Sequence, residues 1–191
     1  MIIFTLISAS IWAIIFAVKR GNVWKYIAGV IFTTYLFCVA SVTILPIQFD
    51  STIRKVFSEN GWKITDHIVL IPFQDGISED DLLNVVMTIP FGFLLPFVKK
   101  RVAWKTALIA GVVLSTIIEL SQLALAAIQG FSFRYVDVAD VICNTAGTMI
   151  GWLIVAVFIC FVQKRKHSDN SENSLYSYIT QRVTIIRIER S

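Results

Sequence analysis

Residues 137–162 read DVADVICNTAGTMIGWLIVAVFICFV, and this stretch decides the fold class. An α-helix rises 1.5 Å per residue, so about 20 apolar residues cross the hydrocarbon core of a bilayer. The stretch is long enough for such a span, and its Asp and Asn side chains are confined to its first third. It therefore predicts a membrane-spanning helix that carries polar side chains toward one end.

Four other apolar runs reach or approach the same length, at residues 1–18, 26–47, 82–98 and 106–128. The third of these is the shortest and contains Pro90 and Pro96, which favour a kink, a tilt or a break in the helix. The composition agrees, because 56% of the residues are hydrophobic and 16% are charged, whereas a soluble domain is roughly 25% charged. We therefore predict an all-α polytopic membrane bundle of about five transmembrane helices.

Basic residues indicate on which side of the membrane each connection lies. They cluster after the first, third and fifth runs, as Lys19, Arg20 and Lys25; Lys99, Lys100, Arg101 and Lys105; and Lys164, Arg165 and Lys166. By the positive-inside rule these three connections are cytoplasmic, which predicts an N-terminus outside and a C-terminus inside. The same pattern explains the net charge of +4 as membrane topology, so we expect no nucleic-acid partner.

The predicted organisation is one transmembrane domain over residues 1–162, followed by a cytoplasmic tail over residues 163–191. The first run lacks the positive n-region of a cleaved signal peptide, so we interpret it as a retained anchor. The extracellular loop 48–81 holds seven acidic residues against three basic ones. Because the loop is longer than most connections in compact bundles, it indicates either a function of its own or a position on the membrane surface.

Polar side chains inside the predicted spans are the main functional signal. An ionisable side chain in hydrocarbon costs on the order of 2.5 to 3.5 kcal/mol, so each one needs a partner or a purpose. At 100° per residue, Glu119 and Gln122 project from one face of their predicted helix. Asp137, Asp140 and Asn144 form a single stripe on the next predicted helix. In the predicted orientation all of these groups lie in the outer half of the membrane.

These positions predict an outward-facing polar pocket between three helices. Arg134, in the loop before the last span, places a cation near the carboxylates and should lower the cost of burying them. We expect the pocket to be formed by Asn84, Glu119, Gln122, Arg134, Asp137, Asp140 and Asn144. Gly147 and Gly151 continue the stripe inward and predict close helix packing. The simpler alternative is a hydrogen-bond network that only clamps the helices together.

The cysteines and histidines carry no recognisable site. Cys38, Cys143 and Cys160 lie inside apolar runs, where a thiol behaves as a small hydrophobe. The two histidines stand apart from one another and from the cysteines, so the usual zinc spacings are missing from the sequence. We expect no disulfide, no metal and no cofactor.

Four sequence blocks occur in order between about residue 66 and residue 152. They are Leu70-Ile71-Pro72-Phe73; Asn84 followed by Ile89-Pro90-Phe91-Gly92-Phe93-Leu94-Leu95-Pro96; Ser115-xxx-Glu119-xx-Gln122; and Arg134-xx-Asp137-xx-Asp140-xxx-Asn144-xx-Gly147-xxx-Gly151. With these blocks the chain resembles the VanZ-like family of bacterial membrane proteins, named for an accessory protein of glycopeptide-resistance clusters. The first block departs from the family pattern at Val69, where members often have Asn.

The resemblance implies a place in the bacterial plasma membrane and a part in resistance to glycopeptides of the teicoplanin kind. Such glycopeptides carry a lipid tail and act on cell-wall precursors at the outer face of the membrane. We therefore expect a cell-envelope protein whose partners are the lipid bilayer and a lipidic or cationic amphiphile, with oligomeric assembly left open.

Two alternatives use the same polar residues. One is an intramembrane enzyme, in which Glu119 and an aspartate act as a general acid and base on a lipid-linked substrate. The other is a proton-coupled transporter or flippase, which would need oligomeric assembly because the chain is short. The sequence contains no GxSxG or HExxH motif, and this favours the non-enzymatic hypothesis.

Overall fold

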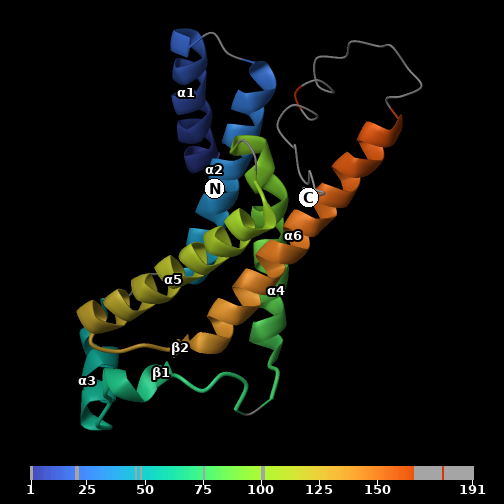
Figure 1. Ribbon diagram of the computed structural model, residues 1–191. Helices are drawn as coiled ribbons and strands as arrows, with labels where there is room; N and C mark the ends of the chain where they lie inside the picture. The colour runs from blue at the N-terminus through green and yellow to red at the C-terminus, as the bar shows by residue number, and fades with distance from the viewer. Residues whose placement is uncertain are drawn as a thin grey trace.

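The computed structural model describes residues 2–19, 22–45, 47, 49–74, 76–99, 102–165 and 178. Its long helices are α1 (Ile2–Lys19), α2 (Val23–Thr43), α4 (Glu79–Val98), α5 (Trp104–Gln129) and α6 (Val138–Arg165) (Figure 1). Among the described residues, α2, α4, α5 and the Val138–Phe161 part of α6 are long and apolar enough to cross a membrane. Helix α1 contributes the shorter apolar stretch Leu6–Ala17. The predicted all-α membrane bundle is confirmed.

Helix α2 begins earlier and ends earlier than the predicted run 26–47. The side chain of Asn22 accepts a hydrogen bond from the backbone N–H of Trp24 (2.9 Å) and so caps the first turn. The helix ends at Thr43, three positions before a proline in the sequence, and a proline disfavours helical geometry at the residue before it.

Helix α4 begins at Glu79, because a capping box forms just outside the predicted run. The Ser78 hydroxyl accepts a hydrogen bond from the backbone N–H of Asp81 (3.1 Å), and the Asp81 carboxylate accepts one from the backbone N–H of Ser78 (2.7 Å). The helix then continues without interruption through Pro90 and Pro96. The Tyr35 hydroxyl of α2 donates a hydrogen bond to the carbonyl oxygen of Met87 (2.7 Å), one turn before Pro90.

Helices α4 and α6 cross in direct backbone contact, and Figure 1 shows α6 lying across α4. A Cβ atom at Gly151 or Gly147 of α6 would overlap the carbonyl oxygen of Ile89 or Val85 of α4. The reverse holds for Gly92 of α4, whose Cβ would overlap the carbonyl oxygen of Thr148. Three glycines on two helices therefore set the closest approach in the bundle, as small residues do between membrane helices.

The connection between α2 and α4 carries short elements of its own. It contains α3 (Ser51–Glu59), a 3-10 turn (Ile64–His67) and the two-residue strand β1 (Ile68–Val69). Strand β1 pairs in parallel with β2 (Val136–Asp137), which directly precedes α6. We call residues 49–74 and 76–78 of this connection, together with residues 130–137 between α5 and α6, the cap.

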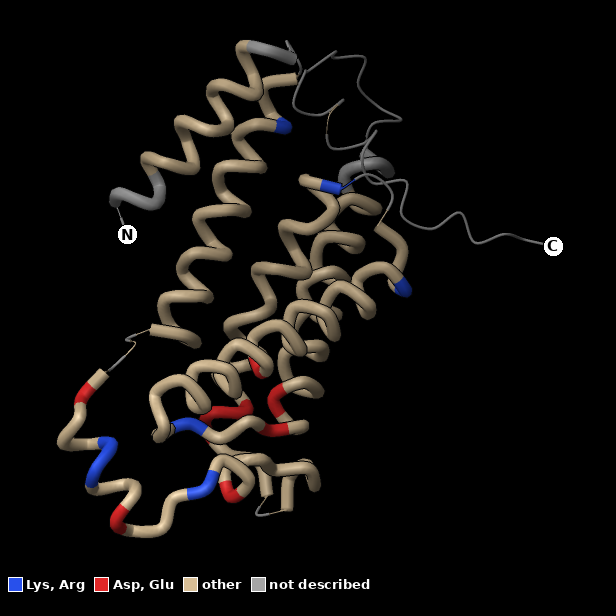
Figure 2. Tube along the Cα trace, turned by 90° about the vertical axis from the view of Figure 1, so that its left-hand side faces the viewer, with Lys and Arg blue, Asp and Glu red and all other residues tan. Residues whose placement is uncertain are grey.

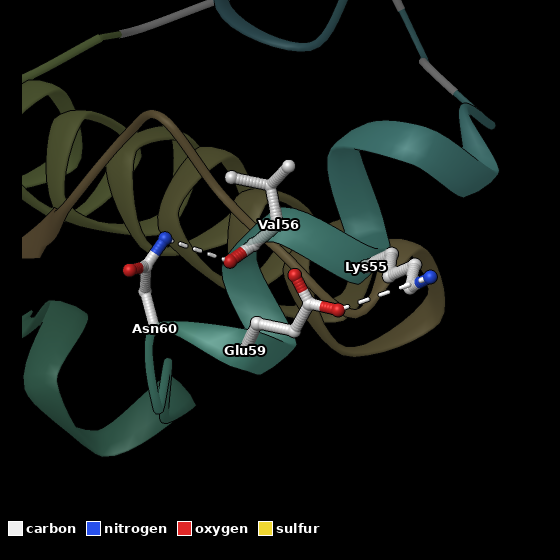
Figure 3. Close-up of polar contacts among 4 residues, drawn as sticks. All are labelled: Lys55, Val56, Glu59 and Asn60. Atoms are coloured by element: carbon white, nitrogen blue, oxygen red, sulfur yellow. Dashed lines mark hydrogen bonds and ion pairs between the residues drawn. The ribbon is translucent and has the colours of Figure 1, made fainter.

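Helix α3 is amphipathic. Phe57 packs against Phe131 and Phe133, with ring centroids 5.4 and 5.2 Å apart. Its polar side is solvated, where Lys55 pairs with Glu59 (3.9 Å) and the Asn60 side chain donates to the carbonyl oxygen of Val56 (2.8 Å) (Figure 3).

Charge divides the bundle into two ends. In Figure 2 the Asp and Glu residues gather at the end that carries the cap. At the opposite end, the charged residues among those described are Lys or Arg. The orientation of these ends across a membrane stays a prediction. Helix α6 extends to Arg165, and apart from residues 163–165 and Tyr178 the predicted tail lies outside the described residues, as do Arg20, Lys100, Arg101 and Lys166.

Candidate functional site

A cavity of about 1030 Å³ opens beneath the cap. Its walls come from α4, α5, α6, the last residues of α2 and the segment between β1 and α4. The volume lies at the upper end of the range of roughly 300 to 1,000 Å³ that is usual for small-molecule sites. All seven residues of the sequence-predicted pocket line it: Asn84, Glu119, Gln122, Arg134, Asp137, Asp140 and Asn144. We call it the acidic cavity.

A hydrogen-bond relay joins α4, α6 and α5 along one wall. The Asn84 side-chain amide donates to Oδ1 of Asp140 (2.6 Å), which links α4 to α6. The Asn144 amide donates to the Ser115 hydroxyl (2.9 Å), which links α6 to α5, and Ser115 is completely buried. Both links use residues one turn apart on α6, as the predicted stripe requires.

Glu119 and Asp137 meet at the start of α6. The backbone N–H of Asp137 donates a hydrogen bond to Oε2 of Glu119 (3.2 Å). The Glu119 carboxylate on α5 therefore pairs with a backbone N–H at the start of α6, where such groups have no partner within the helix. Oδ1 of Asp137 accepts in turn from the backbone N–H of Ala139 (2.7 Å), which is a helix cap. Glu119 is 5% exposed, so its carboxylate lies inside the protein wall of the cavity.

Arg134 does not pair with a carboxylate within the part of the chain that the structure describes. Its guanidinium donates to the carbonyl oxygens of Thr43 (2.7 Å) and Val42 (2.8 Å), at the end of α2. The Gln122 side chain donates to the same Thr43 oxygen (3.0 Å). The last carbonyls of a helix have no partner within it, so Arg134 and Gln122 tie the end of α2 to the cavity. Arg134 thus lines the cavity together with the carboxylates, and its hydrogen bonds go to backbone carbonyl oxygens.

Sequence reasoning missed Asp80 and Asp81, which also line the cavity. Oδ2 of Asp81 is held by the Ser78 cap, and Oδ1 lies 3.8 Å from the Cys143 thiol on α6. A sequence signal for the start of α4 was available, because Ser78-xx-Asp81 before an apolar run is a capping-box pattern. When Asp80 and Asp81 are included, the described lining of the cavity contains five carboxylates: Asp80, Asp81, Glu119, Asp137 and Asp140.

The cap closes one side of the cavity. Its lining includes Val69 of β1, Ile71 and Phe73 from the segment after β1, and Tyr135 from the segment before β2. The His67 ring stacks on the Tyr135 ring with centroids 4.9 Å apart. The predicted 48–81 loop therefore supplies part of the cavity wall. Within the described residues, no three His, Cys, Asp or Glu side chains group as metal ligands would.

The comparison with protein families finds a match over most of the chain. The family model VanZ/LLP1 matches residues 32–159, which include every residue of the predicted pocket. The match begins within α2, earlier than the sequence blocks between residues 66 and 152 indicate. No curated protein and no solved structure matches the chain. Because the family model covers about two thirds of its 191 residues, this multi-pass membrane protein belongs to the VanZ/LLP1 family.

Proposed function

We propose that the chain is a non-enzymatic protein of the bacterial cell envelope that binds a cationic, lipidic amphiphile in the acidic cavity. Through this binding it contributes to resistance against glycopeptides of the teicoplanin kind. The cap faces the outside, as the positive-inside rule predicts, so the cavity lies at the level where such amphiphiles act.

The excess of carboxylates is the observation that carries the proposal. Five carboxylates line the described part of the cavity, and the guanidinium of Arg134 is directed to backbone carbonyls instead. Acidic side chains in a poorly solvated wall attract a cation more strongly than they would in water. A structural clamp needs only the pairs that join helices, such as Asn84 with Asp140. The remaining acids and the size of the cavity favour a ligand.

The apolar part of the cavity supports an amphiphile over a small hydrophilic cation. Leu83, Val86 and Met87 of α4 line the cavity, and the side chains of the first two are each 62% exposed. Exposed apolar side chains on a membrane-spanning helix suit contact with an acyl chain. A ligand with a charged head and an apolar tail would therefore satisfy both parts of the cavity.

Two charge-neutralising variants test the proposal. Glu119→Gln and Asp140→Asn remove a charge but keep an oxygen that accepts the hydrogen bond from Asp137 or Asn84. Glu59→Gln on the exposed face of α3 is the matched control (Figure 3). In a teicoplanin-sensitive host, the native chain and Glu59→Gln should lower susceptibility, and both cavity variants should lose most of this protection. Equal protection by all four proteins at equal membrane levels would overturn the proposal.

A further inference from the structure

The side-chain oxygen of Asn144 is a second, independent sign of a ligand in the acidic cavity. Asn144 is 1% exposed and lines the cavity. Its amide nitrogen donates to Ser115 (2.9 Å), whereas its Oδ1 accepts no hydrogen bond from any described residue. Buried polar atoms in native proteins almost always have a partner. An N–H donor on a ligand would supply one here.

Two carboxylates near Asn144 offer further acceptor atoms. Asp140 lies one turn before it on α6 and uses Oδ1 to accept from Asn84. Glu119 lies on α5 and uses Oε2 to accept from the backbone of Asp137. Its carboxylate is close enough to that of Asp140 for the two like charges to repel each other. The second oxygen of each carboxylate has no hydrogen-bond partner among the described residues. This part of the wall thus presents acceptor oxygens from Glu119, Asp140 and Asn144.

We infer that these three residues form a head-group subsite that binds the primary ammonium group of a membrane-embedded amphiphile and disfavours a quaternary ammonium group. This inference rests on the proposed function and narrows its ligand class. A primary ammonium has three N–H donors and no acceptor, which complements a wall of acceptors. Its hydrogen bonds to carboxylates are charge-assisted and therefore strong.

A quaternary ammonium group would be a poor match for the same subsite. It has no N–H donor, and proteins that recognise it surround it with aromatic faces. The aromatic residues in the described lining, Phe73, Phe133 and Tyr135, belong to the cap segments, whereas the three acceptors lie on α5 and α6. A trimethylated head would therefore leave the Asn144 oxygen unpaired.

The path for the apolar tail follows from the same cavity. The cap covers the cavity at the acidic end, while Leu83 and Val86 of α4 line the cavity and remain largely exposed. A tail that leaves past these two residues would enter the acyl-chain region directly. The ligand therefore reaches the subsite from the bilayer, as a lipid-anchored amine.

The purified full chain in nanodiscs made only of phosphatidylglycerol and phosphatidylcholine tests this inference, because these lipids carry no primary amine. Binding of dodecylamine and of dodecyltrimethylammonium is measured at neutral pH by ligand-induced thermal stabilisation. We expect dodecylamine to bind at least about tenfold more tightly, the factor that one charge-assisted hydrogen bond supplies. Phosphatidylethanolamine added to the nanodiscs should compete if the natural source of the ammonium is a membrane lipid, and not if it is an added amphiphile.

Variants assign the selectivity to the subsite. Asn144→Leu and Glu119→Gln should each reduce the preference for dodecylamine to less than about threefold. Asn60→Leu, which removes an exposed amide from α3, is the control and should keep the full preference (Figure 3).

The possible results distinguish a failure of the head-group subsite from a failure of the proposed function. Equal binding of both amphiphiles by the native chain would overturn the inference and leave the proposed function intact. Binding of neither would overturn both. A preference for dodecylamine that survives in Asn144→Leu and in Glu119→Gln would show that the subsite is built from other residues, and would overturn the assignment made here.

Discussion

Gly151→Ala tests whether the contact between α4 and α6 holds the acidic cavity in shape. The added Cβ would overlap the carbonyl oxygen of Ile89 and lie 2.8 Å from the backbone nitrogen of Phe93. Real Cβ atoms essentially never come closer than 3.0 Å to such atoms. Both neighbours belong to the backbone of α4 and cannot rotate away, so the two helices must move apart.

The size of the effect follows from two opposing contributions. Overpacking a well-packed interface costs typically about 1 to 3 kcal/mol, whereas Ala in a helix is favoured over Gly by up to about 1 kcal/mol. Because the added Cβ meets backbone atoms, the overpacking cost lies in the upper part of its range, at about 2 to 3 kcal/mol, and subtracting about 1 kcal/mol leaves a net loss of roughly 1 to 2 kcal/mol. For a chain of this size that corresponds to a melting temperature lower by about 2 to 8 °C.

The same displacement reaches the cavity. The Asn84 amide and the Asp140 carboxylate are 2.6 Å apart across the α4–α6 interface. A hydrogen bond of this type extends to about 3.2 Å, so a local separation of about 0.6 Å would already bring it to its limit. Gly151→Ala should therefore weaken amphiphile binding as well as thermal stability, although Gly151 does not line the cavity.

The assay is thermal unfolding of the detergent-solubilised protein, with Gly111→Ala as a graded control. A Cβ at Gly111 would lie 3.0 Å from Cβ and 3.1 Å from Oγ1 of Thr148 and 3.2 Å from Cα of Thr145, so these neighbours need to move by only a few tenths of an ångström. The control should match the native melting temperature within about 2 °C. A melting temperature of Gly151→Ala no lower than that of Gly111→Ala would show that the α4–α6 contact is not rigid.

Two other predictions address the end of α2 and the start of α3. Arg134→Lys keeps the positive charge but replaces the planar guanidinium, whose two terminal nitrogens donate to the carbonyl oxygens of Thr43 and Val42, with a single ammonium group. It should lower the free energy of unfolding by roughly 1 kcal/mol while leaving dodecylamine affinity within about twofold; an unchanged melting temperature would contradict the capping role. Backbone hydrogen bonds from Ile53 and Thr52 lower the pKa of Asp50 below its ordinary value. The Asp50 carboxylate should therefore stabilise the start of α3 at and above the ordinary pKa of Asp. This stabilisation should be lost only as the pH falls through the lowered pKa of Asp50. The amide chemical shifts of Thr52 and Ile53, followed by NMR during acidification, should report this transition. Asp50→Asn, which still caps the helix, should abolish it, and a midpoint in the native protein at or above the ordinary Asp range would contradict the prediction.

The helices were predictable because their signal is local. Length and apolarity identify a span within its own residues, and the spacing of Asp137, Asp140 and Asn144 fixes which side chains share a face. Helix ends were less predictable, because they depend on caps such as Asn22 and Ser78 rather than on apolar runs. The capping box at Ser78 was nevertheless present as a sequence pattern.

The partners of the polar residues were not predictable in the same way. Arg134 is near several acids in the sequence, and charge alone favours pairing with them. In the structure it binds carbonyls of Val42 and Thr43, more than ninety positions away. Backbone carbonyls at a helix end are strong acceptors in any sequence, so no side-chain pattern reveals them. The pairing of β1 with β2 is equally hidden, because two residues on each side carry no periodic signal.

The β1–β2 pairing has a consequence for the order of biosynthesis. Ile68 pairs with Val136, so 136 − 68 = 68 further residues must be made before the second strand exists. At a translation rate of roughly 5 to 20 residues per second, this delay lasts about 3 to 14 s. During that interval α4 and α5 are complete but the β1–β2 pairing cannot form, and three of the five cavity carboxylates, Asp80, Asp81 and Glu119, have already been made. A chaperone or insertase that shields acidic spans would act in this interval, and truncation before residue 136 should leave a nascent chain that is especially prone to degradation.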